Sequence, residues 1–505
     1  MSEKKAFLKG TLILTISAFI AKLIGFFNRI FLSQLIGARE LGVYQLIFPV
    51  YLLAFSLTCQ GIQTGLSNLV AYYHAKKEDK NMKFLLYLSI FLSSLVAFLM
   101  MGILYFFSAQ ISTYFLKTPE CYKSIKILAF ALPFVTLKGC LNGYYYGVKK
   151  PLIPSIASLL EQIFRVFSIY LVATLQLANQ EASLAVLGLV IGEIVSCLFT
   201  FIALFTTFHH KSKQKDTLTS PIILGKKLLA LSLPLTANRF ICTLLQSIEA
   251  ILIPFMLNQF YHNVTLSLEL YGILNGMALP FILFPSALTN SLAVMLLPTI
   301  SSATATHNIS LIQKACCLTL HYCLLIGICF THIFLFFGDF LGHLFFQNQL
   351  AGSFLASLSF LCPFVYLSAT TNSILNGLGK TNLTLLHTLL SILIRIGFIV
   401  FLIPVWGMKG YMLGLLVSFF ILCFAHIYGI HTIIPLTFTP VKSVIIPAIL
   451  TGIPFLLLRM LRPYLSVISF IILIVIASFV SFLFMYLLGC FHFSLNPHSS
   501  RRTFL

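Results

Sequence analysis

The chain has 505 residues, of which 59% are apolar and only 9% are charged, whereas soluble domains carry roughly 25% charged residues. This composition excludes an ordinary water-soluble domain. A net charge of +20 would suggest nucleic acid as the partner of a soluble protein, but basic cytoplasmic loops explain most of it in a membrane protein. We therefore expect the lipid bilayer as a partner and no nucleic acid.

Apolar runs of about twenty residues recur along the chain, each long enough to cross a hydrocarbon core about 30 Å thick. Within lipid the backbone must satisfy its own hydrogen bonds, which allows helices or a closed barrel, and continuous apolar runs favour helices. The sequence predicts an all-α polytopic membrane protein with about fourteen spans: 10–35, 41–73, 84–107, 124–147, 152–175, 183–207, 228–256, 270–298, 314–337, 354–377, 383–404, 410–430, 443–460 and 464–490.

The Lys and Arg residues outside these spans or at their ends divide unequally between the two sides of the membrane. Nineteen lie on the side that carries both termini and seven on the other. Because cytoplasmic loops are enriched in Lys and Arg, we expect both termini to be cytoplasmic, in a bacterial cell (inner) membrane.

A weak internal repeat divides the chain. The motif Leu141-Asn142-Gly143, followed by Lys150 and Arg165, resembles Leu375-Asn376-Gly377, followed by Lys380 and Arg395, and Gly42 resembles Gly272 at a similar offset near 230 residues. Such repeats are common in transporters. We predict a six-helix bundle (1–208), a cytoplasmic linker (209–227), a second six-helix bundle (228–432), two additional helices (433–493) and a cytoplasmic tail (494–505).

Six cations fall inside the predicted spans against three acids, Glu161, Glu193 and Glu249. A Lys or Arg at mid-bilayer costs roughly 2.5–3.5 kcal/mol, so such residues normally face a wet cavity or a partner. Glu161 and Arg165, four residues apart, could form a private ion pair, while Arg29, Arg239 and Lys138 could reach the membrane interface. Lys22 lies near the middle of the first span, before Gly25, where a bent helix could open beside a cavity. The six cations are Lys22, Arg29, Lys138, Arg165, Arg239 and Arg395.

Polar side chains also follow one face of the second span, at Gln60, Gln63, Thr64, Ser67 and Asn68. Hydrogen bonding between helices is one interpretation, and a path for carbohydrate is the other. A cationic cavity with amides and hydroxyls suits a phosphate-bearing head and suits a hydrophobic cation badly. The twelve scattered cysteines are expected to pack as small core residues without a metal or a disulfide, and no cofactor is expected.

The stretch 10–70, beginning GTLILTISAF, and the stretch LYGILNGMALPFILFPSALTNSLAVMLLPTIS at 270–301 resemble the stage V sporulation protein B family of polysaccharide flippases. The wider superfamily includes the lipid II flippase MurJ and the multidrug and toxin extruders, built from two six-helix bundles, and MurJ-like members add two C-terminal helices. By similarity, Lys22 and Arg29 are the cavity-facing cations of the first span and Arg239 is the basic residue of the seventh. The second cation of MurJ lies near Asn28, so Arg29 is shifted by one position, and Arg39, unusual for the family, receives no role.

The resemblance and the residues together predict a flippase for an anionic lipid-linked oligosaccharide or peptidoglycan precursor on an undecaprenyl-type carrier, with Na⁺ or H⁺ left open as a coupling ion. An ion-coupled multidrug antiporter, a membrane-embedded glycan enzyme and a sporulation scaffold are the alternatives, and we expect no enzymatic activity. The predicted substrate-binding residues are Lys22, Arg29, Arg239, Arg165, Arg395, Gln60, Gln63 and Asn68.

Overall fold

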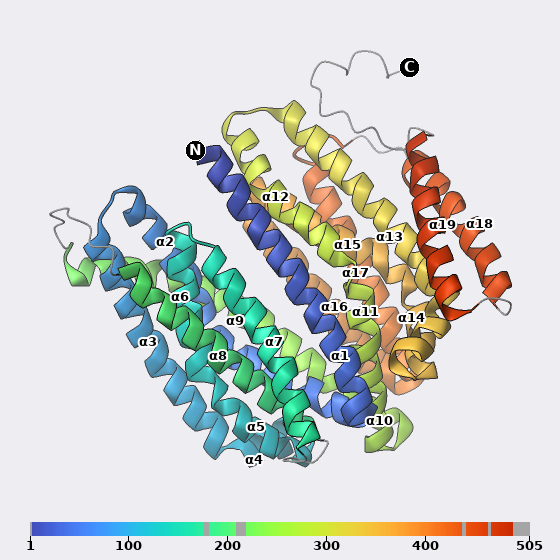
Figure 1. Cartoon of the computed structure of the whole chain (residues 1–505), viewed down its shortest axis with the longest axis horizontal. Helices are drawn as coiled ribbons and strands as arrows, with labels where there is room; N and C mark the ends of the chain where they lie inside the picture. Colours follow the sequence, from blue (N-terminus) through green and yellow to red (C-terminus); the bar gives the residue numbers. More distant parts are fainter. Residues whose placement is uncertain (1–2, 176–180, 209–218, 437–440, 463–465, 488–505) are drawn as a thin grey trace. The chain divides into compact units, whose positions relative to one another are not determined.

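Every described element of the chain is helical, as the apolar runs predict. The computed structural model describes residues 3–175, 181–208, 219–436, 441–462 and 466–487, and Figure 1 shows long helices throughout these ranges. Twelve helices are long and apolar enough to cross a membrane, or up to fourteen if each of two bent pairs is one span. The prediction of an all-α polytopic membrane protein of about fourteen spans is confirmed.

The helices form two compact units. The first unit comprises Met1–Pro280 and Ile392–Tyr411, and the second comprises Phe281–Ser391 and Met412–Leu505. The helices are, in chain order, α1 (Glu3–Phe55), η1 (Ser56–Gln60), α2 (Gly61–Ala75), α3 (Asp79–Phe106), α4 (Ser108–Gln110), η2 (Ile111–Phe115), η3 (Pro119–Cys121), α5 (Tyr122–Ala129), α6 (Ala131–Gly147), α7 (Leu152–Thr174), α8 (Ala182–Phe208), α9 (Pro221–Tyr261), α10 (Val264–Gly272), η4 (Ile273–Ala278), α11 (Leu279–Leu283), α12 (Ser286–Ala305), α13 (Ile309–Phe346), α14 (Gln349–Ser357), η5 (Ser359–Leu361), α15 (Cys362–Gly377), α16 (Thr381–Trp406), α17 (Met408–His431), η6 (Val441–Ile445), α18 (Ile446–Leu461) and α19 (Val467–Leu487).

The predicted division into two bundles and two added helices stays a prediction. Residues 209–218 of the predicted linker 209–227 lie outside the described residues, whereas 221–227 belong to α9. The predicted tail 494–505 also lies outside them.

The first unit is held together by a core between α2, α3, α6 and α9. Leu66, Leu85, Leu141, Tyr145 and Leu228, drawn from these four helices, are fully buried in it. Helix α1 packs against α7 in the same unit, and the two run beside each other in Figure 1. This arrangement brings the polar positions of the first, fourth, fifth and sixth predicted spans into one compact unit.

Helix α1 contains the first predicted span and the start of the second, and its backbone is interrupted at Gly37. Gly37 has φ 77° and ψ 173°, a non-helical conformation that glycine adopts at little steric cost, whereas α1 is helical through Gly25. The backbone breaks at Gly37, about four turns beyond Lys22, and not beside Lys22. After this break, Gly42 lies against α10, where a Cβ on Gly272 would be 2.6 Å from the Gly42 nitrogen. The two glycines matched in the predicted repeat contact each other.

The eighth predicted span, 270–298, is occupied by more than one helix. The structure has 264–283 and 286–305 as separate candidate spans, with turns at Phe284 and Pro285 between them. Proline lacks the backbone N–H that would continue the helical hydrogen bonds. Hydropathy alone does not register this break, because Phe284 and Pro285 interrupt no apolar run.

Two bent helix pairs support the internal repeat. Pro119–Ala129 and Ala131–Gly147 meet at 46°, and Gln349–Ser357 and Ser359–Gly377 meet at 42°. The first residues of the two pairs, and also their last residues, are 230 positions apart in the sequence. Both pairs therefore place one bend at the same point of the repeat.

The turn that follows each bent pair is also repeated. Lys149 has φ 58° and Gly379 has φ 77°, so each turn contains one left-handed residue, as helix ends often do. The next residue donates its N–H back into the helix in both cases, Lys150 to Tyr145 at 2.9 Å and Lys380 to Leu375 at 2.9 Å. The predicted match of Lys150 with Lys380 thus corresponds to the same turn geometry.

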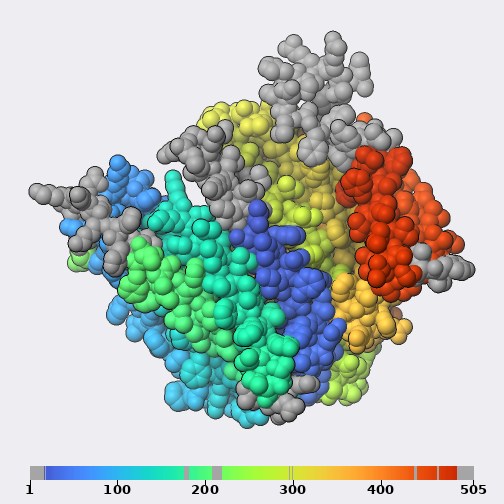
Figure 2. All heavy atoms as spheres, viewed as in Figure 1, coloured from blue at the N-terminus to red at the C-terminus, as the bar shows by residue number. Residues whose placement is uncertain are grey.

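In the second unit, α18 and α19 pack against each other and α18 packs against α13. Phe337, Phe455 and Phe470, one from each of these helices, are buried together in a shared apolar cluster. Figure 2 shows α18 and α19 exposing many side chains at the surface of the protein. A hydrophobic outer surface of this kind is expected for helices whose other face meets lipid.

Candidate functional site

A buried network of ion pairs joins four helices of the first unit. The Lys138 ammonium on α6 lies 2.8 Å from Glu161 on α7 and also pairs with Glu193 on α8. Arg165, one turn after Glu161 on α7, binds the other oxygen of Glu161 at 2.6 Å. The Tyr51 hydroxyl of α1 donates a hydrogen bond of 3.0 Å to Glu193. Two acids thus neutralise two cations.

Glycines on α8 allow this network to form. A Cβ at Gly192 would lie 2.7 Å from the Glu161 carbonyl oxygen, and one at Gly188 would lie 3.0 Å from the Arg165 carbonyl oxygen. Gly188 and Gly192 are one turn apart, a spacing of small residues that lets membrane helices approach closely. The close packing of α7 and α8 places Glu193 beside Lys138.

The structure confirms one predicted pair and corrects one prediction. The alternative that Glu161 and Arg165 pair on one helical face is confirmed, but Glu161 also binds Lys138. The suggestion that Lys138 reaches the membrane interface is wrong: its side chain is 11% exposed, between side chains of Glu161 and Glu193 that are 12% and 5% exposed. The two carboxylates compensate the charge of the buried ammonium, so the Lys138 side chain does not need to reach water.

A second buried pair links α16 to α9 within the first unit. Arg395 Nε lies 2.8 Å from Glu249, and the two side chains are 11% and 9% exposed. Arg165 and Arg395 are matched in the repeat, yet Arg165 takes its acid from its own helix and Arg395 from another. Both arginines were predicted to bind substrate, and the structure places each against a carboxylate.

The three remaining intramembrane cations have no acidic partner among the described residues. Across the described ranges, no carboxylate oxygen lies within 4.0 Å of Lys22, Arg29 or Arg239. Lys22 and Arg239 are exposed and Arg29 is half-buried. All three acids of the predicted spans are thus used by Lys138, Arg165 and Arg395, which leaves three positive charges uncompensated.

Lys22 and Arg29 lie two helical turns apart on α1. Seven residues correspond to two helical turns, so the side chains emerge on one face about 10 Å apart along the axis. Arg29 donates to the carbonyl of Asn275 at 3.5 Å and lies close enough to Arg165 for the guanidinium groups to repel each other. The neighbouring Asn28 is buried, and its side-chain oxygen has no hydrogen-bond partner among the described residues. Polar groups able to bind a ligand therefore continue from Lys22 toward the ion-pair network.

The amide side chains that follow one face of the second predicted span differ in how deeply they are packed. Gln60 ends the π-helical turn η1, and Gln63 lies where α2 packs on α6, since a Cβ at Gly139 would be 3.6 Å from its side-chain oxygen. Gln60 and Gln63 are half-buried and Asn68 is exposed. The interhelical interpretation therefore fits Gln63, whereas Asn68 is free to meet a ligand.

Sequence reasoning did not find the partners of Lys138 or Arg395. They lie 23 and 55 residues from Lys138 and 146 residues from Arg395, beyond the reach of helical spacing rules. The available signal was the presence of three acids inside the predicted spans, where an acid normally has a partner. Within the described residues, no group of three or more His, Cys, Asp or Glu side chains could hold a metal ion.

The fold is similar to the folds of solved transporters, among them one of the MOP superfamily. Over 94% of this chain and 98% of the compared chain, it superposes on the lipid II flippase MurJ in an inward closed conformation, with a TM-score of 0.72 at 16% identity. It also matches an inward-facing multidrug resistance MATE transporter with a TM-score of 0.62 at 15% identity, over 83% and 98% of the two chains.

The sequence comparisons give the family. The profile of the family described as "Polysaccharide biosynthesis protein" matches residues 7–304, and the chain belongs to this family. Stage V sporulation protein B of Bacillus subtilis (strain 168) is 25% identical over 445 residues, covering 86% of this chain and 85% of the relative. Sporulation protein YkvU of the same organism is 26% identical over 361 residues, covering 70% and 78%. The chain is a multi-pass membrane protein.

Proposed function

We propose that the chain is a flippase that translocates an anionic lipid-linked oligosaccharide or peptidoglycan precursor, on an undecaprenyl-type carrier, by alternating access. The observation that supports it is the charge balance of the first unit. Lys138, Arg165 and Arg395 form ion pairs with the three acids of the predicted spans. Lys22, Arg29 and Arg239 therefore present net positive charge inside these spans. Uncompensated cations in a membrane are costly and are kept for function.

The three cations suit a pyrophosphate. Arg29 and Arg239 offer planar guanidinium groups that bind phosphate oxygens through two parallel hydrogen bonds, and Lys22 offers a compact charge. The carrier's tails remain in lipid while the pyrophosphate and sugar enter the protein. Gln60 and Asn68 line the carbohydrate path, and Gln63, packed between α2 and α6, lies at its edge. Arg165 and Arg395 contribute only by exchanging a carboxylate for phosphate.

Alternating access also requires an energetic bias. A bound anion shifts the equilibrium between two conformations only through different affinities for them. The membrane potential adds about 2.3 kcal/mol per charge moved across 100 mV. The proposal assigns no residue to a coupling ion, and Na⁺ and H⁺ gradients are varied separately in the test.

The test is translocation of a fluorescent lipid-linked sugar in reconstituted vesicles. We expect Lys22→Ala and Arg29→Ala each to slow translocation by roughly tenfold or more, the effect of losing one charge-assisted contact. Lys22→Arg should retain most of the rate, because the charge remains. Lys409→Ala, which removes an exposed lysine outside the predicted site, is the control. Wild-type rates in both alanine variants would contradict the site assignment.

The same vesicles discriminate the alternatives. An ion-coupled multidrug antiporter would transport a cationic dye and leave the lipid-linked sugar in place. A scaffold would support spore or wall formation in cells when Lys22→Ala and Arg29→Ala had abolished translocation. A glycan enzyme would alter the labelled sugar chemically, which chromatography of the recovered lipid detects. The flippase proposal requires an unchanged sugar in the opposite leaflet.

A further inference from the structure

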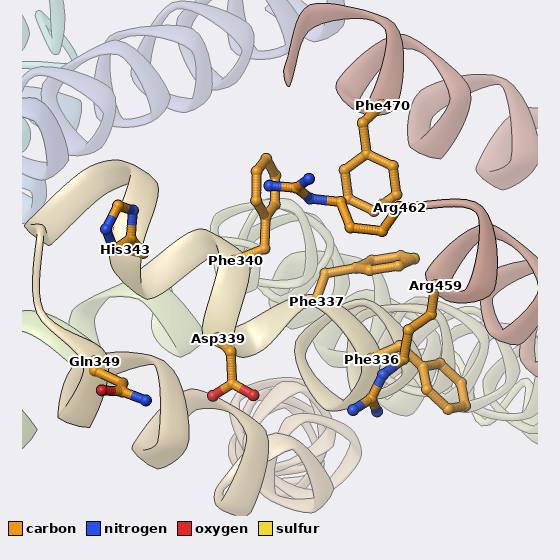
Figure 3. Close-up of a pocket in the computed structure, with 9 residues that line it drawn as sticks. All are labelled: Phe336, Phe337, Asp339, Phe340, His343, Gln349, Arg459, Arg462 and Phe470. Carbon is orange, nitrogen blue, oxygen red and sulfur yellow. The ribbon is translucent and has the colours of Figure 1, made fainter. Parts of the chain in front are cut away.

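A pocket lies at the ends of three membrane-crossing helices of the second unit, and none of its lining residues belongs to the proposed flippase site. It has a volume of about 490 Å³ and is lined by side chains of α13, α14, α18 and α19 and of the residue that follows α18. Figure 3 shows Arg459 and Arg462 extending from α18 and the segment after it toward side chains of α13. Because α13 and α18 end here and α19 begins here, the pocket lies at the level of lipid headgroups, whichever side of the membrane it faces.

An aromatic cluster holds Arg462 in place. Its guanidinium carbon lies 4.6 Å from the ring centre of Phe340 and 5.4 Å from that of Phe470. The Phe340 and Phe470 rings contact each other edge to face at 5.0 Å, and Phe337 contacts Phe470 at 5.1 Å. Cation–π contacts fix the plane of the guanidinium while leaving its N–H groups available at the rim. Arg462 is therefore preorganised to bind a planar or tetrahedral anion.

The polar groups of the pocket are not paired with one another. Within the described parts of the chain, no carboxylate lies within ion-pair distance of Arg459 or Arg462, and Asp339, in the same pocket, forms no ion pair. His343 and Gln349 add further hydrogen-bonding groups. The ordinary explanation, that basic residues at a helix end reach for water, accounts for the exposed Arg459 but not for the stacked Arg462.

Apolar surface continues from the pocket along the two terminal helices. Leu456, Leu457 and Met460 on α18 and Ile468 and Ile472 on α19 are exposed. A ligand with a phosphate head and acyl chains would place its head between the arginines and its chains along these side chains. A volume of about 490 Å³ also lies within the roughly 300–1,000 Å³ of small-ligand pockets.

We propose that this pocket binds the phosphate headgroup of an anionic phospholipid, with Arg459 and Arg462 holding the phosphate oxygens and the acyl chains lying on α18 and α19. Two arginines three residues apart supply the bidentate donors that phosphate prefers. Asp339 at the edge of the pocket accepts hydrogen bonds from a headgroup that carries hydroxyl groups, such as a glycerol.

The test counts bound lipid by native mass spectrometry of the full-length protein, exchanged from phosphatidylglycerol or phosphatidylcholine mixed micelles. We expect the wild type to retain phosphatidylglycerol roughly tenfold better than phosphatidylcholine, and Arg459→Gln/Arg462→Gln to lose that preference. Lys409→Gln/Lys442→Gln removes two exposed cations elsewhere and should keep it. If the arginine double variant kept the wild-type preference for phosphatidylglycerol, the proposal would be overturned.

Two further measurements keep the outcome clear. Inorganic phosphate in millimolar excess should not displace the lipid, and full displacement would assign the pocket to a free anion. Photo-crosslinking with a phosphatidylglycerol that is photoreactive in its headgroup uses the wild type and so does not depend on the folding of a variant. Crosslinks should fall at 336–349, 459–462 and 466–470, and crosslinks confined to described residues elsewhere would refute the site. None of these readouts depends on translocation, so the proposed function can fail independently.

Discussion

Neutralising Glu193 perturbs the buried network at one defined point. In Glu193→Gln, Lys138 and Arg165 share the single carboxylate of Glu161, and the Tyr51 hydroxyl loses its charged acceptor. Removing one partner of a buried pair typically costs about 3–5 kcal/mol. Because Glu161 still binds Lys138, we expect a loss near the lower end, about 3 kcal/mol in the free energy of unfolding.

Lys138→Met should cost more, toward about 5 kcal/mol, because Glu193 then keeps only the hydrogen bond from Tyr51. The double variant Lys138→Met/Glu193→Gln leaves the Glu161–Arg165 pair intact and buries no uncompensated charge. It should be more stable than Lys138→Met alone, because the free-energy effects of substitutions at residues in contact do not simply add. Equilibrium unfolding in mixed micelles of mild detergent and dodecyl sulfate, followed by far-UV circular dichroism, measures all three.

The exposed pair of Arg39 and Glu120 is the matched control. Arg39 lies 2.6 Å from Glu120, with side chains 37% and 53% exposed, and it also pairs with Glu40 at 2.8 Å. Glu120→Gln removes only the exposed pair and should cost only about 0–1 kcal/mol. If Glu193→Gln cost no more than this control, or if the double variant lost the sum of the single effects, the argument from burial and mutual pairing would be refuted.

Two other predictions concern packing and pairing. Glu249→Gln leaves Arg395 buried without its acid and should lower the free energy of unfolding by about 3–5 kcal/mol, whereas Glu249→Gln/Arg395→Met should recover part of that loss in the same assay. Gly42→Val places a side chain against the Leu268 carbonyl and Gly272 and should cost about 1–3 kcal/mol by overpacking. Gly102→Ala meets no atom within 4 Å and should be neutral or stabilising by about 0.5–1 kcal/mol, so equal destabilisation of both variants would contradict the close approach of α1 and α10.

The candidate site was predictable to different degrees for different residues. The Glu161–Arg165 pair follows from helical periodicity alone, because residues four apart share one face. The exposure of Lys22 and Arg239 and the half-burial of Arg29 agree with a group of cations that no acid neutralises. The location of Lys138 was not predictable, because its partners lie on two other helices and its apolar neighbours in the sequence give no hint of them.

The breaks in the helical backbone also differ in how far the sequence predicts them. The break at Gly37 is available to sequence analysis as a glycine, but glycine is also common within membrane helices, so its residue type alone does not select it over Gly25. The break at Phe284 and Pro285 is invisible to hydropathy because both residues are apolar. In contrast, the repeat of the turns at Lys149 and Gly379 was detectable from spacing, since the same hydrogen bonds require the same number of residues.

The amino-acid sequence by itself determined the solvent, the helical class, the approximate number of spans and the excess of cations over acids inside the spans, because each follows from composition and local periodicity in a medium that offers no hydrogen bonds. The tertiary structure alone decided which cations keep their charge uncompensated. Ion pairing depends on distances of about 3 Å between side chains on different helices, and only the packing of α6, α7 and α8 around Gly188 and Gly192 sets those distances.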